Sequence, residues 1–273
     1  MKIRNSALIT LGFVGSMTAA QAQFVLLDDF ESYTAGSSIG AAANWTSTVP
    51  AGRSDHTVGT ETGNQYLSTA SNAPGATYDG DVHSVFNNGS TLLADAATGT
   101  FFFRAQIGTG GAHAGVGMGI TDALDAGWND AAGIVRLGNR TDGATSNRTN
   151  FYGYNASTYD NLNVPAAVDE WYNVWVVLDN AADTYDVHMQ RDGDATVATQ
   201  TLVGDDLVFR NTTAAATIES IFIRAARDNT FAAFDDLHFA QGSNLANPVP
   251  EPSAFALLAG LLGLSVAAVR RRS

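Results

Sequence analysis

Trp171-Tyr172-Asn173-Val174-Trp175-Val176-Val177-Leu178-Asp179 is a run in which apolar side chains recur at every second residue. Side chains two residues apart lie on the same face of a β-strand, so this run has the period of a strand and not that of a helix. The polar segment Asp179–Asp183 follows, and Thr184–Gln190 then resumes the alternation with Tyr185, Val187 and Met189 on one face. Two alternating runs joined by a short polar loop predict a β-hairpin.

The same alternation recurs along the rest of the chain and is broken each time by Gly, Asn, Asp or Thr. The further runs are Phe101–Ile107, Thr196–Val203, Ile218–Arg224 and Phe231–Ala240. Residues 23–245 offer no convincing amphipathic helix. Many short strands without crossover helices favour antiparallel sheets, so we expect an all-β, two-sheet sandwich formed by residues 23–245.

Three segments of this body resemble the laminin-G and concanavalin A-like jelly rolls. Phe24–Tyr33 is similar to the opening strand of that fold, Trp171–Trp175 with the Asp192-Gly193 turn to its central meander, and Phe234–Phe239 to its closing strand. The resemblance implies that the first and last strands are neighbours. A galactose-binding-like jelly roll shares the opening and closing pattern and is the alternative.

The first 22 residues have the form of a secretory signal peptide. Lys2 and Arg4 precede the mostly apolar, small residues 6–19, and Ala20-Gln21-Ala22 supplies a cleavage pattern. We therefore predict a signal peptide over residues 1–22 and a mature chain that begins near Gln23.

The last residues form three adjacent parts. Residues 246–253 are a proline-rich linker containing Val249-Pro250-Glu251-Pro252, residues 254–269 carry no charge, and residues 270–273 are a basic tail. A helix over 254–269 would be about 24 Å long, somewhat short of the ~30 Å hydrocarbon core, a gap that local thinning and snorkelling arginines can close. We predict one transmembrane helix, with the basic tail on the cytoplasmic side.

These three parts, in this order, resemble the PEP-CTERM sorting signal of Gram-negative bacteria. The residues that carry the match are Val249, Pro250, Glu251, Pro252, Arg270, Arg271 and Arg272. The resemblance implies export, tethering in the inner membrane, processing by an exosortase-type enzyme, and a final place at the cell surface or in the extracellular matrix.

The charge balance excludes several classes of function. Residues 23–248 hold 26 acidic side chains against nine arginines and no lysine. Such a surface repels phosphate backbones, so we expect no nucleic-acid partner. The chain has no cysteine, which excludes disulfides and thiol chemistry.

Catalysis has little support in the sequence. The concanavalin A-like fold includes glycoside hydrolases whose catalytic strand carries Glu-x-Asp-x-x-Glu, a run that this chain lacks, and a retaining mechanism needs two carboxylates about 5 Å apart. Glu31, Glu61, Glu170 and Glu219 are each far from another glutamate in the body of the chain. We predict a protein that is not an enzyme, and a divergent polysaccharide hydrolase or lyase is the alternative.

Four carboxylates suggest a structural calcium ion. Asp28 and Asp29 lie in the first predicted strand, and Asp235 and Asp236 in the last. Alternation places Asp235 on the same face as Leu237, and an inward carboxylate is costly unless it is paired or binds a cation. Oxygen ligands favour Ca²⁺. The alternative is that these are solvated acids that discourage edge pairing of the strands.

Three aromatic residues are candidates for stacking on sugar rings. Trp128 lies in a loop-like run, and Tyr152 and Tyr154 share one face of a predicted strand. The alternative for each is ordinary packing. Together with the sorting signal, these residues favour non-catalytic glycan binding or attachment within exopolysaccharide. A purely structural surface protein or adhesin remains the other hypothesis.

Overall fold

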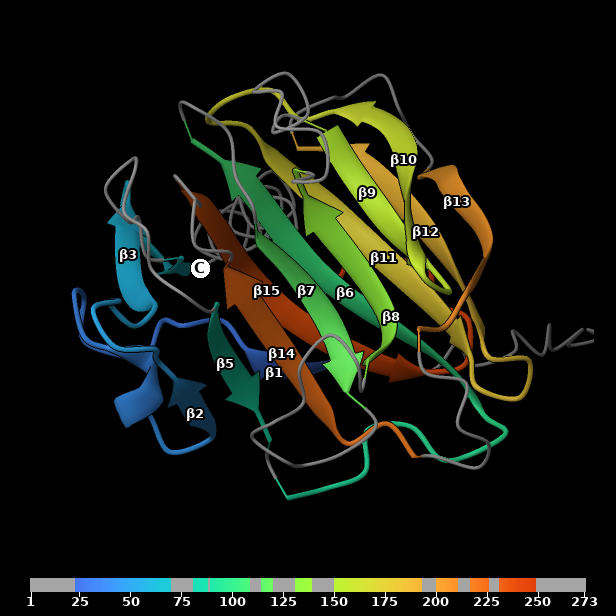
Figure 1. Ribbon diagram of the computed structural model, residues 1–273, viewed down its shortest axis with the longest axis horizontal. Helices are drawn as coiled ribbons and strands as arrows, with labels where there is room; N and C mark the ends of the chain where they lie inside the picture. The colour runs from blue at the N-terminus through green and yellow to red at the C-terminus, as the bar shows by residue number, and fades with distance from the viewer. Residues whose placement is uncertain are drawn as a thin grey trace, which may run out of the picture.

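The structure is a computed structural model that describes residues 23–69, 81–87, 89–108, 114–119, 131–138, 150–192, 200–210, 217–225 and 231–248 (Figure 1). The predicted signal peptide 1–22, the predicted glycan contact Trp128, and residues 249–273 with the sorting signal and the predicted transmembrane helix lie outside these ranges. Within the residues that the structure describes, no helix has the length and apolar character needed to cross a membrane.

The described chain folds as two antiparallel sheets, as the alternation predicts. The eight-stranded sheet has the order β13 (Thr201–Val208), β12 (Thr184–Arg191), β11 (Trp171–Asp179), β6 (Thr98–Ile107), β15 (Ala232–Gln241), β4 (Asn64–Ser68) and β3 (Thr57–Glu61), with β1 (Val25–Asp28) also paired to β15. The seven-stranded sheet has the order β10 (Thr158–Pro165), β9 (Asn150–Asn155), β8 (Ala131–Leu137), β7 (Ala114–Gly119), β14 (Ser220–Ala225), β5 (Val82–Phe86) and β2 (Trp45–Thr48). A single turn of 3-10 helix, η1 (Ile39–Ala41), precedes β2.

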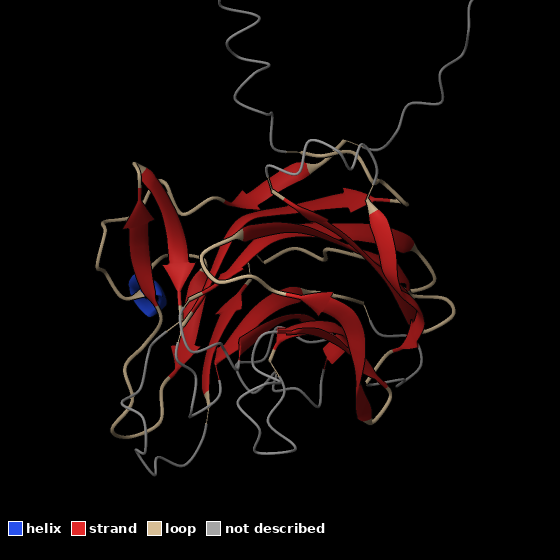
Figure 2. Cartoon of the chain, turned by 90° about the horizontal axis from the view of Figure 1, so that it is seen from above, coloured by secondary structure: helices blue, strands red, loops and turns tan. Residues whose placement is uncertain are grey.

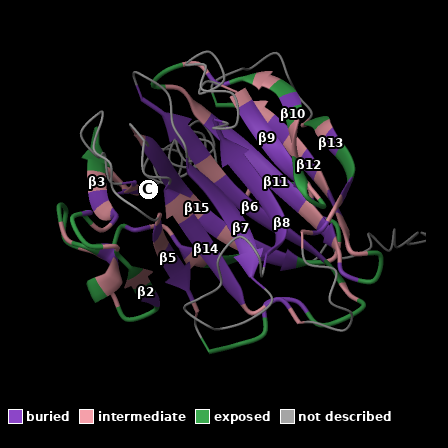
Figure 3. Cartoon of the chain, viewed as in Figure 1, coloured by how far each residue is buried: buried purple, intermediate pink, exposed green. Residues whose placement is uncertain are grey.

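The two sheets stack face to face and enclose one core. Figure 2 shows the sheets as two curved layers, with the outer face of the seven-stranded sheet on the inside of the curve. Tyr185 of β12 spans the space between them, since its hydroxyl lies 2.8 Å from the carbonyl oxygen of Ile134 and 2.6 Å from that of Tyr154. Buried residues fill the middle strands, and exposed ones gather at β2, β3, β10 and β13 (Figure 3).

The predicted hairpin is confirmed, and the strand after it lies further along the chain than predicted. β11 and β12 pair from Asp179 opposite Thr184. The alternation predicts the third strand at Thr196–Val203, but β13 begins at Thr201 and runs to Val208. Asp205 and Asp206 interrupt the alternation in the sequence, and the structure absorbs them in a β-bulge where the register shifts, so that pairing continues beyond them.

The first and last strands are neighbours, as the resemblance implies, but the first is short. β1 pairs with β15 and ends at Asp28 instead of continuing to Tyr33. The Asp28 carboxylate accepts a hydrogen bond from the Phe30 backbone N–H at 2.8 Å, and Phe30 has a φ of 59°. A non-glycine residue in this left-handed region turns the chain out of the strand.

A second bulge changes the direction of Asp235. The register of β15 against β6 shifts between Asp235 and His238, and Asp236 has a φ of 52°. Asp235 therefore lies opposite Arg104 on the outer face, while Leu237 packs in the core. The prediction that Asp235 shares the face of Leu237 is wrong. The extra residue at the bulge places the side chains before and after it on faces opposite to those that simple alternation predicts.

The last described residues pack on the outer face of the eight-stranded sheet. The indole N–H of Trp175 donates to the carbonyl oxygen of Ala246 at 2.9 Å, and the side-chain amide of Gln200 donates to that of Leu245 at 2.5 Å. Trp175 is fully buried as a result, although its strand position faces away from the core.

Candidate functional site

The outer face of the seven-stranded sheet carries the two predicted tyrosines. In β9, a Cβ on Gly153 would lie 2.4 Å from Leu207, which places Gly153 on the core side. Tyr152 and Tyr154, the residues on either side, therefore face outward. The two tyrosines thus share one face of the sheet, as predicted, and this face lies on the inside of the curve in Figure 2.

Tyr154 belongs to a cluster of two tyrosines and two arginines. The rings of Tyr154 and Tyr159 meet edge to face with centroids 4.6 Å apart. The guanidinium of Arg210 lies 4.5 Å from the ring centre of Tyr154, and that of Arg136 lies 5.0 Å from the ring centre of Tyr159. Each such cation–π contact contributes on the order of 0.5–1 kcal/mol. We call Arg136, Tyr154, Tyr159 and Arg210 the tyrosine–arginine cluster.

The members of the cluster differ in how accessible they are. Tyr152 and Tyr154 are only 4% and 5% exposed, and burial raises the pKa of the Tyr154 hydroxyl. Tyr159 and Arg210 are half-buried, and the neighbouring Asn161 of β10 is exposed. A ligand at this face would therefore touch Tyr159, Arg210 and Asn161 before it reached the two predicted tyrosines.

The middle of this face combines glycines on β7 with buried apolar side chains of the neighbouring strands, since Val85, Ala131, Ile134, Tyr154 and Phe222 form a second apolar cluster outside the main core. Gly115, Gly117 and Gly119 of β7 stand opposite Arg224, Phe222 and Ser220 of β14. A Cβ on Gly117 would lie 2.3 Å from the ring of Phe222, so this ring covers the β7 backbone directly. Glycine is required at this position because any larger residue would displace the phenyl ring.

Carboxylates are scarce on this face. Asp81, the residue before β5, forms an ion pair with Arg224, whose pKa burial lowers to about 9. The described strand residues whose side chains face outward on this sheet include no aspartate or glutamate. They are Thr46, Thr48, His83, Val85, Gly115, Gly117, Gly119, Ala131, Ile134, Arg136, Tyr152, Tyr154, Tyr159, Asn161, Ser220, Phe222 and Arg224. These positions therefore lack the carboxylate pair that glycoside hydrolysis needs.

The four acids predicted to bind calcium have different surroundings. Asp28 is buried, and its oxygens accept hydrogen bonds from the Phe30 N–H at 2.8 Å, the Tyr33 hydroxyl at 2.6 Å and the Trp45 indole N–H at 2.7 Å. Burial and the hydrogen bond to Asp28 raise the pKa of Tyr33. Asp29 is half-buried and accepts a hydrogen bond from the backbone N–H of Glu31 at 3.2 Å.

Asp235 and Asp236 share an arginine. Arg104 Nη1 lies 3.9 Å from the Asp235 carboxylate and 3.3 Å from that of Asp236, and Nη2 lies 2.5 Å from Asp192. The Asn64 side-chain amide donates to Asp235 at 2.8 Å. Burial, with the neighbouring Asp236 charge, raises the pKa of Asp235 to about 8, and burial also raises the pKa of Asp236. Calcium binding by these four acids stays a prediction.

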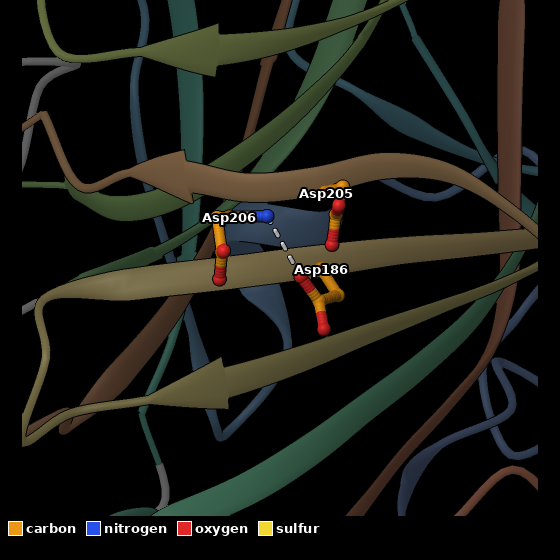
Figure 4. A group of neighbouring side chains, drawn as sticks. All are labelled: Asp186, Asp205 and Asp206. Atoms are coloured by element: carbon orange, nitrogen blue, oxygen red, sulfur yellow. Dashed lines mark hydrogen bonds between the residues drawn. The ribbon is translucent and has the colours of Figure 1, made fainter.

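A different group of acids could hold a metal ion. Asp186 of β12 faces Asp205 and Asp206 across the bulge in β13, and oxygens of the three carboxylates all lie within 4.8 Å of one another (Figure 4). The Asp206 backbone N–H donates to the Asp186 carboxylate at 2.9 Å, and this hydrogen bond joins the bulge in β13 to β12. Three oxygen ligands at an exposed edge suit a hard cation such as Ca²⁺. The sequence signal was the Asp205-Asp206 pair, but only the bulge brings Asp186 beside it.

The comparisons with known proteins show the fold. No protein-family model and no curated protein matches the sequence. The structure is similar to the catalytic domain of a glycoside hydrolase family 131 protein from Coprinopsis cinerea, with a TM-score of 0.53 and 12% identity over 82% of this chain and 96% of that one. It is also similar to lectin UEA-II in complex with galactose (TM-score 0.52, 8% identity, 82% and 100% covered) and to lectin II from Ulex europaeus (TM-score 0.50, 8% identity, 82% and 100% covered).

The described chain thus has the concanavalin A-like two-sheet jelly roll of lectins and glucanases, as its resemblance implies. At these identities the likeness extends to the fold alone. Function has to be inferred from the residues on it.

Proposed function

We propose that this chain is an exported, exosortase-sorted protein of the cell surface or extracellular matrix that binds a glycan without cleaving it. The glycan contacts the tyrosine–arginine cluster on the outer face of the seven-stranded sheet. In the setting implied by the sorting signal, the ligand is exopolysaccharide.

The observation that carries this proposal is the arrangement of Arg136, Tyr154, Tyr159 and Arg210 on one curved face. Aromatic rings offer apolar surfaces to the C–H faces of sugars, and guanidinium groups donate several hydrogen bonds in a fixed plane to hydroxyl or carboxylate oxygens. Exposed Asn161, beside the cluster, adds an amide that both donates and accepts.

Binding without hydrolysis is favoured by the residues of the face. Its described outward strand positions include arginine, tyrosine, glycine and asparagine but no aspartate or glutamate, whereas glycoside hydrolysis needs two carboxyl groups. The Coprinopsis cinerea relative in fold is a glycoside hydrolase, so a divergent hydrolase is the second candidate. A search for newly formed reducing ends during incubation with polysaccharide separates the two.

Substitution of the accessible members of the cluster tests the proposal. We expect Tyr159→Ala and Arg210→Ala each to weaken binding about ten-fold or more, equivalent to about 1.4 kcal/mol or more of lost binding energy. The measurement is calorimetric titration against exopolysaccharide of the native host and a panel of soluble polysaccharides. Thr46→Ala is the matched control, because Thr46 is exposed on the same face at the opposite edge, in β2.

Two results would contradict the proposal. One is a wild-type protein that binds no polysaccharide of the panel. The other is a loss of affinity in Thr46→Ala as large as that in the two cluster variants, which would point to a general effect on the sheet.

A further inference from the structure

A pocket of about 510 Å³ opens on the other sheet, away from the tyrosine–arginine cluster. It lies between the start of the body, at β1, and the last described residues, which pack on the outer face of the eight-stranded sheet. Its lining includes Gln23, Phe24, Leu26, His238, Asn244 and Asn247. Its volume falls within the roughly 300–1,000 Å³ that is typical of small-ligand sites.

The aromatic wall of this pocket is held in place by packing. The ring of Phe24 meets Phe102 edge to face at 6.2 Å and His238 at 6.3 Å. Phe102 in turn packs edge to face against Trp175 at 5.1 Å, and Trp175 is tied to the chain end by its hydrogen bond to Ala246. The half-buried Phe24 ring therefore offers a fixed apolar surface at the pocket.

The polar wall of the pocket has a defined hydrogen-bonding character. Nδ1 of His238 lies 2.9 Å from the carbonyl oxygen of Asp236. A carbonyl only accepts, so Nδ1 carries a proton, and the neutral form of the ring offers Nε2 as an acceptor. Gln23 and Asn247 add carboxamides, whereas the side-chain oxygen of buried Asn244 already accepts a hydrogen bond from the Ala246 N–H at 2.9 Å. Among the residues that the structure describes, no lysine, arginine, aspartate or glutamate lines the pocket.

We infer that this pocket binds a neutral saccharide of one or two rings. An apolar ring surface beside amides and an imidazole acceptor matches the C–H face and the hydroxyls of a sugar. A charged ligand would lose its hydration without finding an opposite charge in the lining. This site is separate from the tyrosine–arginine cluster, and it exists whether or not that cluster binds a glycan.

Filling the pocket tests the inference. Leu26 lines the pocket and is 48% exposed, so Leu26→Trp places an indole at the site without disturbing the core. Val25→Trp is the matched control, because Val25 is 63% exposed on the other face of β1 and does not line the pocket. The probes are glucose, galactose and cellobiose, titrated at up to roughly 50 mM and followed by protein NMR.

We expect the wild type to bind at least one of these probes saturably, with a dissociation constant on the order of millimolar. Leu26→Trp should weaken that binding about ten-fold or more, while Val25→Trp and the cluster variant Tyr159→Ala stay within about two-fold of the wild type. The inference is overturned if no probe saturates, if the two tryptophan variants lose affinity equally, or if Tyr159→Ala alone abolishes binding. The last outcome would assign the sugar to the cluster, so failure of this inference is distinguishable from failure of the proposed function.

Discussion

Asp28→Ala should lower the free energy of unfolding by about 4 kcal/mol, one of the two largest effects that we expect. The Asp28 side chain is the common acceptor for three donors: the Phe30 N–H, the Tyr33 hydroxyl and the Trp45 indole N–H. Two of these hydrogen bonds are buried. Leaving a buried donor without an acceptor costs roughly 1–3 kcal/mol of folding free energy. Removing the Asp28 carboxylate leaves all three donors without their acceptor, so these costs add up in a single substitution.

Chemical denaturation, run once with calcium and once with a chelator, measures this effect. Because protein donors already occupy the Asp28 oxygens, the loss should be the same in both conditions. Asp29→Ala is the matched control, with an expected loss of less than about 1 kcal/mol, since half-buried Asp29 accepts only a local backbone hydrogen bond at 3.2 Å.

A loss that occurs with calcium and vanishes with the chelator would contradict this account of Asp28. It would instead make Asp28 a metal ligand, as the sequence predicts. If Asp28→Ala and Asp29→Ala lowered the free energy of unfolding equally, the three hydrogen bonds of Asp28 would not be the source of the stability lost in Asp28→Ala.

Stability should also fall as the pH rises from 6.5 to 8, and Asp235 should be the cause. Burial and the Asp236 charge raise the pKa of Asp235 from 3.8 to about 8 in the folded protein. Between these two values the folded state holds a proton that the unfolded state has lost. Folding stability is therefore lost with rising pH, at about 1.4 kcal/mol per pH unit for one proton.

A buried histidine opposes this trend at lower pH. Burial lowers the pKa of His56 from 6.5 to about 4, so in that range the unfolded state takes up a proton that the folded state does not. The contribution of His56 therefore grows as the pH rises toward 6.5 and is constant above it. Above pH 6.5 the effect of Asp235 acts without this compensation, and the wild type should lose about 1.6 kcal/mol by pH 8, where Asp235 is half-ionised.

Asp235→Asn isolates the effect. The amide retains an acceptor oxygen, cannot ionise, and should reduce the loss between pH 6.5 and 8 to less than about 0.5 kcal/mol. Arg104, Asp192, Asp236 and His238 surround this position and are unchanged in the variant. Unfolding curves at half-unit pH steps measure both proteins. A variant that loses as much stability as the wild type would contradict the assignment.

Much of the fold was predictable because alternation is a local signal. β11 begins and ends at the residues that its sequence pattern indicates, and the hairpin to β12 follows from the polar loop after Asp179. The errors occur where one inserted or left-handed residue resets the alternation. Asp236 in β15 and Asp206 in β13 both have positive φ at a bulge, and Phe30 ends β1 in the same way.

The candidate site was only partly predictable, because its members meet through strand pairing and turns that the sequence pattern did not indicate. Tyr152 and Tyr154 were found from their common strand face. Tyr159 pairs with Tyr154 across the β9–β10 hairpin, a turn that was not predicted from the sequence. Arg210 follows β13 of the other sheet, and no spacing in the sequence relates it to Tyr154. The acidic group of Asp186, Asp205 and Asp206 was missed for the same reason, since its geometry depends on the β12–β13 register.

The most direct test of glycan recognition is a map of backbone chemical shifts. Fragments of the tightest-binding polysaccharide would be titrated into the isotope-labelled protein. Glycan binding at the tyrosine–arginine cluster predicts shift changes concentrated in β8, β9 and β10 and at Arg210, all saturating with one dissociation constant. Saturable binding that leaves these strands unchanged would contradict it.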